Sequence, residues 1–151
     1  MPYWISAFVQ RLRAIFGSAP SATANAEPVD PELRDAFLAE LDDIITNAKA
    51  ALVKLQAEPE NPAHARTLSR GFHTLKGSAP LVGATALAQI GRAGEQMLQR
   101  MAERRLASPQ QIAAIDKALT HLPAWKQALH HGHNTPAGTQ QVIAQLQRNI
   151  D

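Results

Sequence analysis

Residues 72–79 of this chain read Phe72-His73-Thr74-Leu75-Lys76-Gly77-Ser78-Ala79. Around this stretch apolar residues recur at helical spacing, which predicts a helix with one face in a core; they are Leu68, Phe72, Leu75, Ala79 and Val82. His73 falls beside this stripe, and Lys76 and Gly77, one turn later, project over the same surface. A glycine inside a helix costs about 1 kcal/mol relative to alanine, which suggests that the space beside the histidine is needed. The pattern indicates an imidazole that a bulky anion can reach.

Basic and polar side chains extend the flank on which His73 lies. Arg66, Ser69 and Arg70 precede the histidine, and with Lys76 they give this flank a basic character suited to phosphate. A histidine beside an apolar stripe is more often an ordinary surface residue than a reactive one. The conjunction of the histidine with a lysine, a glycine and arginines is what favours a chemical role for His73.

The run His73-Thr74-Leu75-Lys76-Gly77-Ser78-Ala79 resembles the phosphorylation motif of histidine-containing phosphotransfer (HPt) domains. It is most similar to those of CheA-like chemotaxis and pilus-motility hybrid histidine kinases, and the similarity extends over about residues 30–104. The resemblance implies an all-α fold, an antiparallel four-helix bundle, to which we expect this chain to add a C-terminal helix and an N-terminal amphipathic helix. It also implies that His73 accepts and passes on a phosphoryl group in a two-component or chemotaxis-like phosphorelay. A histidine kinase and a response-regulator receiver domain would be the partners.

The resemblance also assigns a role to Glu95. CheA-like phosphotransfer domains have a glutamate at this offset from the reactive histidine, and it hydrogen-bonds the imidazole. A carboxylate that accepts a hydrogen bond from Nδ1–H leaves the lone pair on Nε2, so we expect Glu95 to hold His73 in that tautomer. The alternative is an exposed helix carboxylate that pairs with Arg92 or Gln99.

Other residues would serve the phosphoryl group and the partner. We expect Lys76 to lie near the phosphoryl oxygens and partly offset their charge. Gly77 would leave room for the partner's active-site loops. The residues expected to dock the partner are Arg66, Ser69, Arg70 and Arg92.

Composition narrows the function further. The chain has 151 residues, enough for one domain, and no cysteine, which excludes thiolate metal sites and a cysteine nucleophile and fits a cytoplasmic location. Its formal charge of +2 is too small and dispersed to indicate nucleic-acid binding, and no apolar run is long enough to span a bilayer.

The sequence has neither a phosphate-cradling glycine loop nor an acidic cluster that could bind magnesium. We therefore expect no cofactor, and a phosphoryl carrier rather than an enzyme, with catalysis supplied by its partners.

The N-terminus is predicted to be a separate piece. Residues 1–16 form an amphipathic pattern with Arg11 and Arg13 on its polar face, and residues 17–29 read as a flexible linker rich in Ala, Ser and Pro. The amphipathic helix is expected to pack on the bundle or a neighbouring chain, with a role at a membrane surface or in docking a partner as the alternative. A signal peptide is disfavoured because polar residues break the apolar stretch.

Residues 30–151 are predicted to form the helical bundle. Asp30-Pro31 and Asn61-Pro62 each combine an N-cap side chain with proline at the first helical position, and Ser108-Pro109 repeats the signal. The helices are expected over 31–57, from 62 to about Pro80, over 84–104, from 109 with a kink or interruption at Pro123, and from Thr135-Pro136 onward. Proline at 80 should disturb the end of the His73 helix.

Two alternatives remain. His130, His131 and His133 could suggest a metal site, but adjacent histidines without a nearby carboxylate make a poor one, and histidines complement the dipole at a helix C-terminus. We expect no metal. A non-phosphorylated helical adaptor is the alternative function, although such a scaffold has no need of a glycine beside a histidine. We expect a monomer, and the methionine start favours a stand-alone module over part of a larger kinase if this is the whole gene product.

Overall fold

A computed structural model describes residues 29–132 and 135–150. Within these ranges the chain forms five α-helices and no strand: α2 (Pro31–Ala57), α3 (Pro62–Ser78), α4 (Thr85–Arg104), α5 (Pro109–His130) and α6 (Thr139–Arg148), with the short 3₁₀-helix η1 (Ala79–Val82) after α3. The all-α prediction is confirmed. The helix expected over residues 1–16 and nearly all of the linker expected over 17–29 lie outside the described residues.

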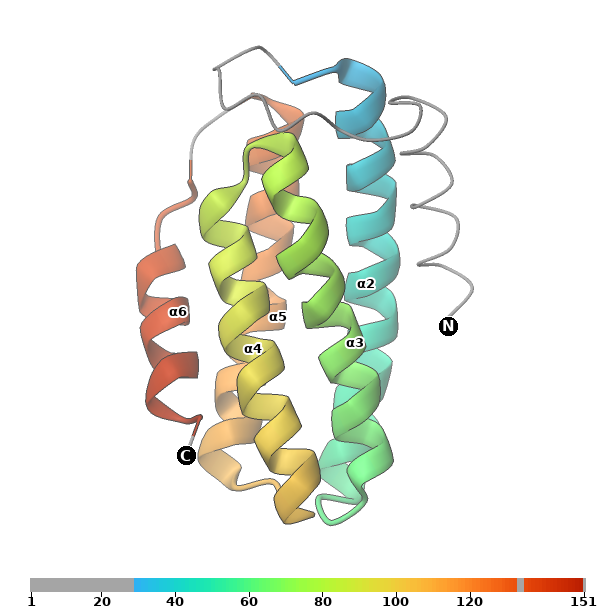
Figure 1. The fold of residues 1–151 in the computed structure, drawn as a ribbon, viewed down its shortest axis with the longest axis vertical. Coiled ribbons are helices and arrows are strands. Elements are labelled where there is room, and N and C mark those ends of the chain that lie inside the picture. The colour runs from blue at the N-terminus through green and yellow to red at the C-terminus, as the bar shows by residue number, and fades with distance from the viewer. Residues whose placement is uncertain (1–28, 133–134, 151) are drawn as a thin grey trace.

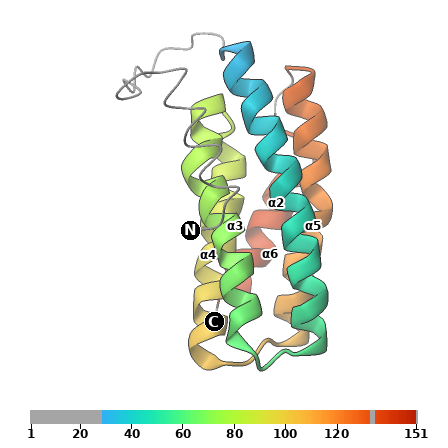
Figure 2. The ribbon, with the colours of Figure 1, turned by 90° about the vertical axis from the view of Figure 1, so that its right-hand side faces the viewer.

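Helices α2 to α5 form an antiparallel bundle, with α3 and α4 on one side and α2 and α5 on the other (Figures 1 and 2). The closest pairing is between α3 and α4, while α2 packs against both α3 and α5. The shorter α6 lies against α4 and α5. The predicted four-helix bundle with an additional C-terminal helix is therefore the observed architecture.

Three helices begin where the capping signals predict. The side chains of Asp30 and Asn61 accept hydrogen bonds from the backbone N–H groups of Glu32 and Ala63, at 2.8 and 3.0 Å. Ser108 and Gln111 form a reciprocal capping box at the start of α5. In each case the cap satisfies backbone donors that have no partner within the helix.

The core is a continuous apolar cluster along the bundle axis. It includes the apolar stripe around His73, since Leu68, Phe72 and Leu75 are each 1 % exposed or less. The other large side chains at its centre are Phe37, Leu41, Ile44, Leu55, Leu87, Ile90, Met97 and Leu98. Burial of this face fixes the rotation of α3 and leaves His73 on the outer side of the helix.

The end of α3 is disturbed as proline at 80 predicts. The α-helix stops at Ser78, and η1 continues the chain to Gly83, which adopts a left-handed conformation with φ of 74°. Glycine takes this conformation at little steric cost. The turn brings the chain back so that α4 runs antiparallel to α3.

Two predictions about the C-terminal half were wrong in detail. Of the kink or interruption predicted at Pro123, the interruption is not observed, because helix α5 continues through this residue to His130; Pro123 is exposed, and its neighbours Leu122 and Trp125 are buried in the core. The last helix begins at Thr139, not at Thr135-Pro136, because Pro136 and Gly138, with φ of 91°, form a turn first.

Candidate functional site

His73 lies on the outer crest of α3 with 65 % of its side chain exposed. The residues one and two turns before it, Arg70 and Arg66, and Gly77 one turn after it, are also exposed. They form a stripe along the helix because residues spaced by three or four share a face. The imidazole is therefore accessible from solvent.

Glu95 projects from α4 toward α3 and lies beneath the imidazole. Its Oε2 accepts a hydrogen bond from Nδ1 of His73, and its Oε1 accepts one from Nζ of Lys76 at 2.5 Å. The glutamate side chain is 9 % exposed and that of Lys76 is 35 % exposed. The alternative in which Glu95 is an exposed carboxylate paired with Arg92 or Gln99 does not describe this geometry.

This hydrogen bond determines which ring nitrogen of His73 is available. A carboxylate only accepts hydrogen bonds, so Nδ1 carries the proton and, in the neutral ring, Nε2 carries the lone pair. With Nδ1 directed at the buried carboxylate, Nε2 is the nitrogen available to a group arriving from solvent. The site thus offers a nucleophilic nitrogen at the protein surface, supported from below by a buried charge.

The ionisation of Glu95 reflects opposing influences. Burial by itself raises the pKa of this carboxyl group, but the hydrogen bonds and charges of Lys76 and His73 together outweigh it. The net pKa of Glu95 is lowered from the ordinary glutamate value of 4.5. The carboxyl group therefore stays ionised near neutral pH and serves as the acceptor for both neighbours.

Two glycines of α4 allow this helix to approach α3 closely enough for Glu95 to hydrogen-bond His73 and Lys76. A Cβ atom at Gly91 would lie 2.5 Å from the backbone nitrogen of Lys76 and 2.7 Å from the carbonyl oxygen of Phe72. A Cβ at Gly94 would overlap the ring of Phe72. Any larger residue at either position would push α4 away from α3, and with it Glu95 from His73.

The predicted docking residues divide between two places. Arg66, Ser69 and Arg70 line a groove of about 550 Å³ between α3 and α4, and its other lining residues are Leu98, Gln99, Ala102 and Glu103. Arg92 is exposed on α4, one turn before Glu95. The α4 wall of this groove was not predicted, because its residues are ordinary exposed or small helix residues that only packing brings opposite the arginines.

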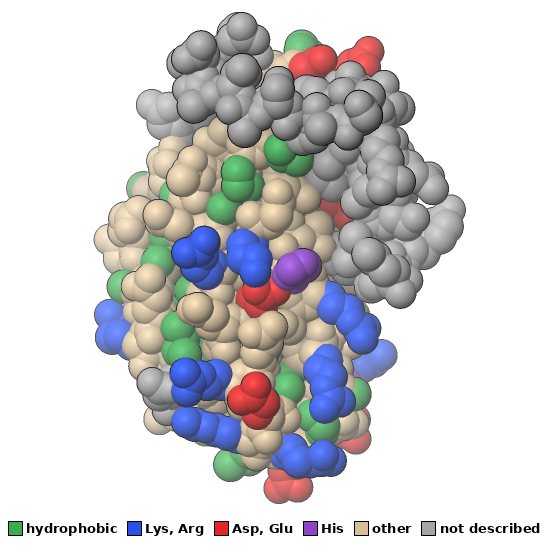
Figure 3. Space-filling view, in the orientation of Figure 1, with side chains coloured by type: hydrophobic (Ala, Val, Ile, Leu, Met, Phe, Trp, Pro, Cys, Tyr) green, Lys and Arg blue, Asp and Glu red, His purple; other side chains and the backbone are tan. Residues whose placement is uncertain are grey.

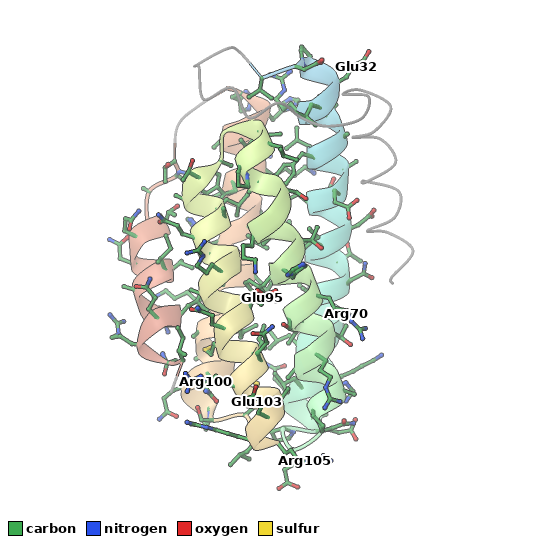
Figure 4. The ribbon with its side chains drawn as sticks, viewed as in Figure 1. Glu32, Arg70, Glu95, Arg100, Glu103 and Arg105 are labelled. Atoms are coloured by element: carbon green, nitrogen blue, oxygen red, sulfur yellow. The ribbon has the colours of Figure 1, made fainter. Side chains whose placement is uncertain are left out.

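Basic side chains surround the site on this face of the molecule. Figure 3 shows a histidine side chain with an acidic side chain beside it and lysine or arginine side chains on both sides. Figure 4 shows Glu95 between α3 and α4, with Arg70 on the outer side of α3 and Glu103 further along α4.

The described residues fit neither a metal site nor a membrane-spanning helix. They contain no group of three or more His, Cys, Asp or Glu residues that could hold a metal ion, and His133 of the C-terminal histidine cluster lies outside them. Over the same ranges no helix has the length and apolar character needed to cross a bilayer.

Comparison with known proteins points to one family. A sequence model of the Hpt domain matches residues 32–125. The chemotaxis proteins CheA of Listeria monocytogenes and Listeria innocua are each 25% identical to the chain over 114 residues, which cover 75% of this chain and 18% of the relative. The match thus spans less than a fifth of the length of these relatives. No solved structure matches the chain significantly.

Proposed function

The chain belongs to the Hpt domain family of histidine phosphotransfer modules, and we propose that it carries the phosphoryl group on Nε2 of His73. The observation that carries this proposal is the exposed imidazole whose Nδ1 is hydrogen-bonded to the buried carboxylate of Glu95. That arrangement leaves the outer ring nitrogen with its lone pair and open to solvent.

The chemistry would be a simple exchange at phosphorus. The Nε2 lone pair attacks the phosphorus of an aspartyl phosphate, the N–P bond forms as the acyl O–P bond breaks, and aspartate leaves as a carboxylate. With ATP held by a kinase domain, the same attack would release ADP. In both cases the Nδ1 proton stays in its hydrogen bond to Glu95, so the ring gains the phosphoryl group without losing its orientation.

Lys76 and Gly77 would support the phosphorylated state and the approach of the partner. The ammonium group of Lys76 is held by Glu95 one turn from His73 and is 35 % exposed, so it lies within reach of the incoming phosphoryl oxygens. A Cβ built at Gly77 meets no atom within 4 Å, so glycine here answers no packing need within the described chain. A partner's loop coming close to the helix would explain it.

We propose that the chain acts as a carrier and that its partners supply catalysis. A receiver domain would supply the aspartate and its metal ion, and a histidine kinase would supply ATP. Arg66, Ser69 and Arg70 along the groove and Arg92 on α4 are the candidate docking residues. The non-phosphorylated adaptor is the reading that would replace this one if His73 accepts no phosphate.

The test is phosphorylation of the full chain by phosphoramidate, a small donor, and by a phosphorylated receiver domain. We expect one added phosphoryl group by intact mass, stable in base and lost in acid. His73→Gln should abolish the gain while its circular dichroism spectrum matches that of the wild type. Labelling that persists in His73→Gln, or a folded wild-type chain that neither donor labels, would contradict the proposal.

A further inference from the structure

The exposed stripe of α3 is asymmetric about His73. Toward the start of the helix it carries Arg70 and Arg66, whereas toward the end it carries Gly77, beside which a side chain would meet open space. Along this stripe, two arginines thus lie on one side of His73 and exposed backbone lies on the other, while Lys76, which Glu95 holds, and Arg92 of α4 lie beside the stripe. A protein that docks over His73 meets a different surface in each of the two orientations it can adopt.

The two arginines are not neutralised within the described part of the chain. Neither guanidinium group has an ion pair or side-chain hydrogen bond there, and the nearby carboxylate of Glu95 is taken up by His73 and Lys76. Glu103 lies on the α4 wall of the same groove, but this single negative charge does not balance the two positive charges of the arginines. Their positive potential therefore extends into solvent.

The positive charge is a property of this side of the bundle and not of the whole molecule. Helices α3 and α4 carry Arg66, Arg70, Lys76, Arg92, Arg100 and Arg104 against only Glu95 and Glu103. On α2 the balance is reversed, with Glu32, Asp35, Glu40, Asp42 and Asp43 against three basic residues, Arg34, Lys49 and Lys54. The chain as a whole has a formal charge of only +2. This separation favours an acidic partner on the α3–α4 side.

We infer that Arg66 and Arg70 select a phosphoryl-exchange partner whose docking surface is acidic, and that they fix the orientation in which it docks. The partner's acidic residues would lie over the groove between α3 and α4, and its reactive loops over Gly77. This inference rests on the proposed function of His73 and adds the chemical character of the partner to it.

Chemistry at the imidazole and docking of the partner are assigned to different residues. Lys76 and Glu95 act on the imidazole and the phosphoryl group, so changes there should slow the chemical step with any donor. Arg66 and Arg70 make no hydrogen bond or ion pair with Glu95 in the described structure, and Figure 4 shows Arg70 on the outer side of α3, so they act only on a partner large enough to reach them. A phosphodonor as small as phosphoramidate does not reach across to these arginines, so its rate of labelling of His73 serves as the internal reference of the experiment.

The experiment measures phosphoryl transfer between the full chain and a receiver domain that carries acidic side chains around its phosphorylated aspartate. We expect Arg66→Glu/Arg70→Glu to lower the second-order rate constant at least about tenfold at low salt, and to flatten its dependence on salt. Lys49→Glu/Lys117→Glu, which makes the same change of charge on α2 and α5, is the matched control and should behave as the wild type. Neutralising the receiver's acidic residues should remove the difference between the two variants.

Phosphoramidate labelling distinguishes a failure of partner docking from a failure of His73 to accept a phosphoryl group. If wild type and the arginine variant are labelled equally but the arginine variant and the lysine control exchange equally with the receiver, the docking inference is wrong while the role of His73 stands. If phosphoramidate does not label the wild type, the proposed function itself fails. Salt-sensitive binding to anionic phospholipid vesicles that depends on Arg66 and Arg70, with receiver exchange unchanged, would instead assign the arginines to a membrane surface.

Discussion

At the scale of single residues, the site depends on one carboxylate that serves two donors. Glu95 is buried, yet its two oxygens accept hydrogen bonds from His73 and Lys76 and so replace the water that burial removes. Neither His73 nor Lys76 alone supplies hydrogen bonds to both oxygens of the carboxylate. His73 fixes the carboxylate under the ring, and Lys76 adds a positive charge, so the three residues form one unit across two helices.

The lowered pKa of Glu95 leads to a pH-dependent prediction. In the unfolded chain the carboxyl group titrates near 4.5, and in the folded chain below it, so its contribution to stability is fully present above pH 4.5 and is lost as the pH falls toward the folded-state value. Wild type should therefore exceed Glu95→Gln in free energy of unfolding near neutral pH, and the difference should shrink below pH 4.5. Urea denaturation across this range measures it, and a difference that does not change with pH would refute the assignment.

At the scale of elements, the contact between α3 and α4 determines whether the site exists. His73 and Lys76 come from one helix and Glu95 from the other, so their distances follow the separation of the helix axes. That separation is small because Gly91 and Gly94 present no side chain to Phe72 and Leu75. The loss of helix propensity at two glycines is the cost of this close approach.

Gly91→Ala should therefore destabilise the protein, although alanine is the better helix former. The propensity gain is about 1 kcal/mol, while overpacking costs roughly 2–3 kcal/mol, the upper part of its usual range, because the added methyl group meets backbone atoms of α3; we therefore expect a net loss of about 1–2 kcal/mol in urea denaturation. His73 should also be labelled more slowly by phosphoramidate as Glu95 moves away.

The matched control is Gly77→Ala, where the added methyl group meets open space. It should raise the free energy of unfolding by roughly 0.5–1 kcal/mol and leave labelling by phosphoramidate unchanged. A Gly91→Ala protein as stable as the control would show that α3 and α4 are not held together by this contact.

At the scale of the whole molecule, α6 closes the bundle on the side of α4 and α5, away from α3. The hydroxyl group of Thr139, which is 1 % exposed, donates to the carbonyl of Pro136 at 2.8 Å and lies 2.7 Å from Nε2 of His121, from which it accepts. At the other end Gln111 donates to the carbonyl of Asn149. Burial lowers the pKa of His121 from its ordinary value of 6.5, so the folded state loses stability as the pH falls below 6.5.

Thr139→Val should loosen α6 without disturbing the site. The change leaves the His121 N–H and the Pro136 carbonyl without their partner, which costs about 1–3 kcal/mol. We expect faster amide hydrogen exchange in α6 and unchanged labelling of His73, since α6 packs chiefly against α4 and α5 and contributes no residue to the site. A large loss of labelling would mean that α6 supports the position of Glu95 through α4.

Local signals in the sequence were sufficient for the helix starts and the helix faces. Asp30-Pro31, Asn61-Pro62 and Ser108-Pro109 act within one turn of the chain, and the apolar repeats need only the helical period, so neither depends on the rest of the fold. The motif around His73 was equally local. These features determined the all-α class, the boundaries of α2, α3 and α4, and the histidine as the residue of interest.

Tertiary packing decided the rest. Whether Glu95 was exposed or buried, and whether it met Arg92 or His73, depended on how closely and at what rotation α4 lies on α3, and that is set by Gly91, Gly94 and Phe72 together. The continuation of α5 through Pro123 accompanies the burial of Leu122 and Trp125 in the shared core, whereas the late start of α6 at Thr139 follows from the turn at Pro136 and Gly138. The sequence could single out His73 because the features around it belong to one helix, but the carboxylate of Glu95 lies on another helix, and only the packed structure brings the two together.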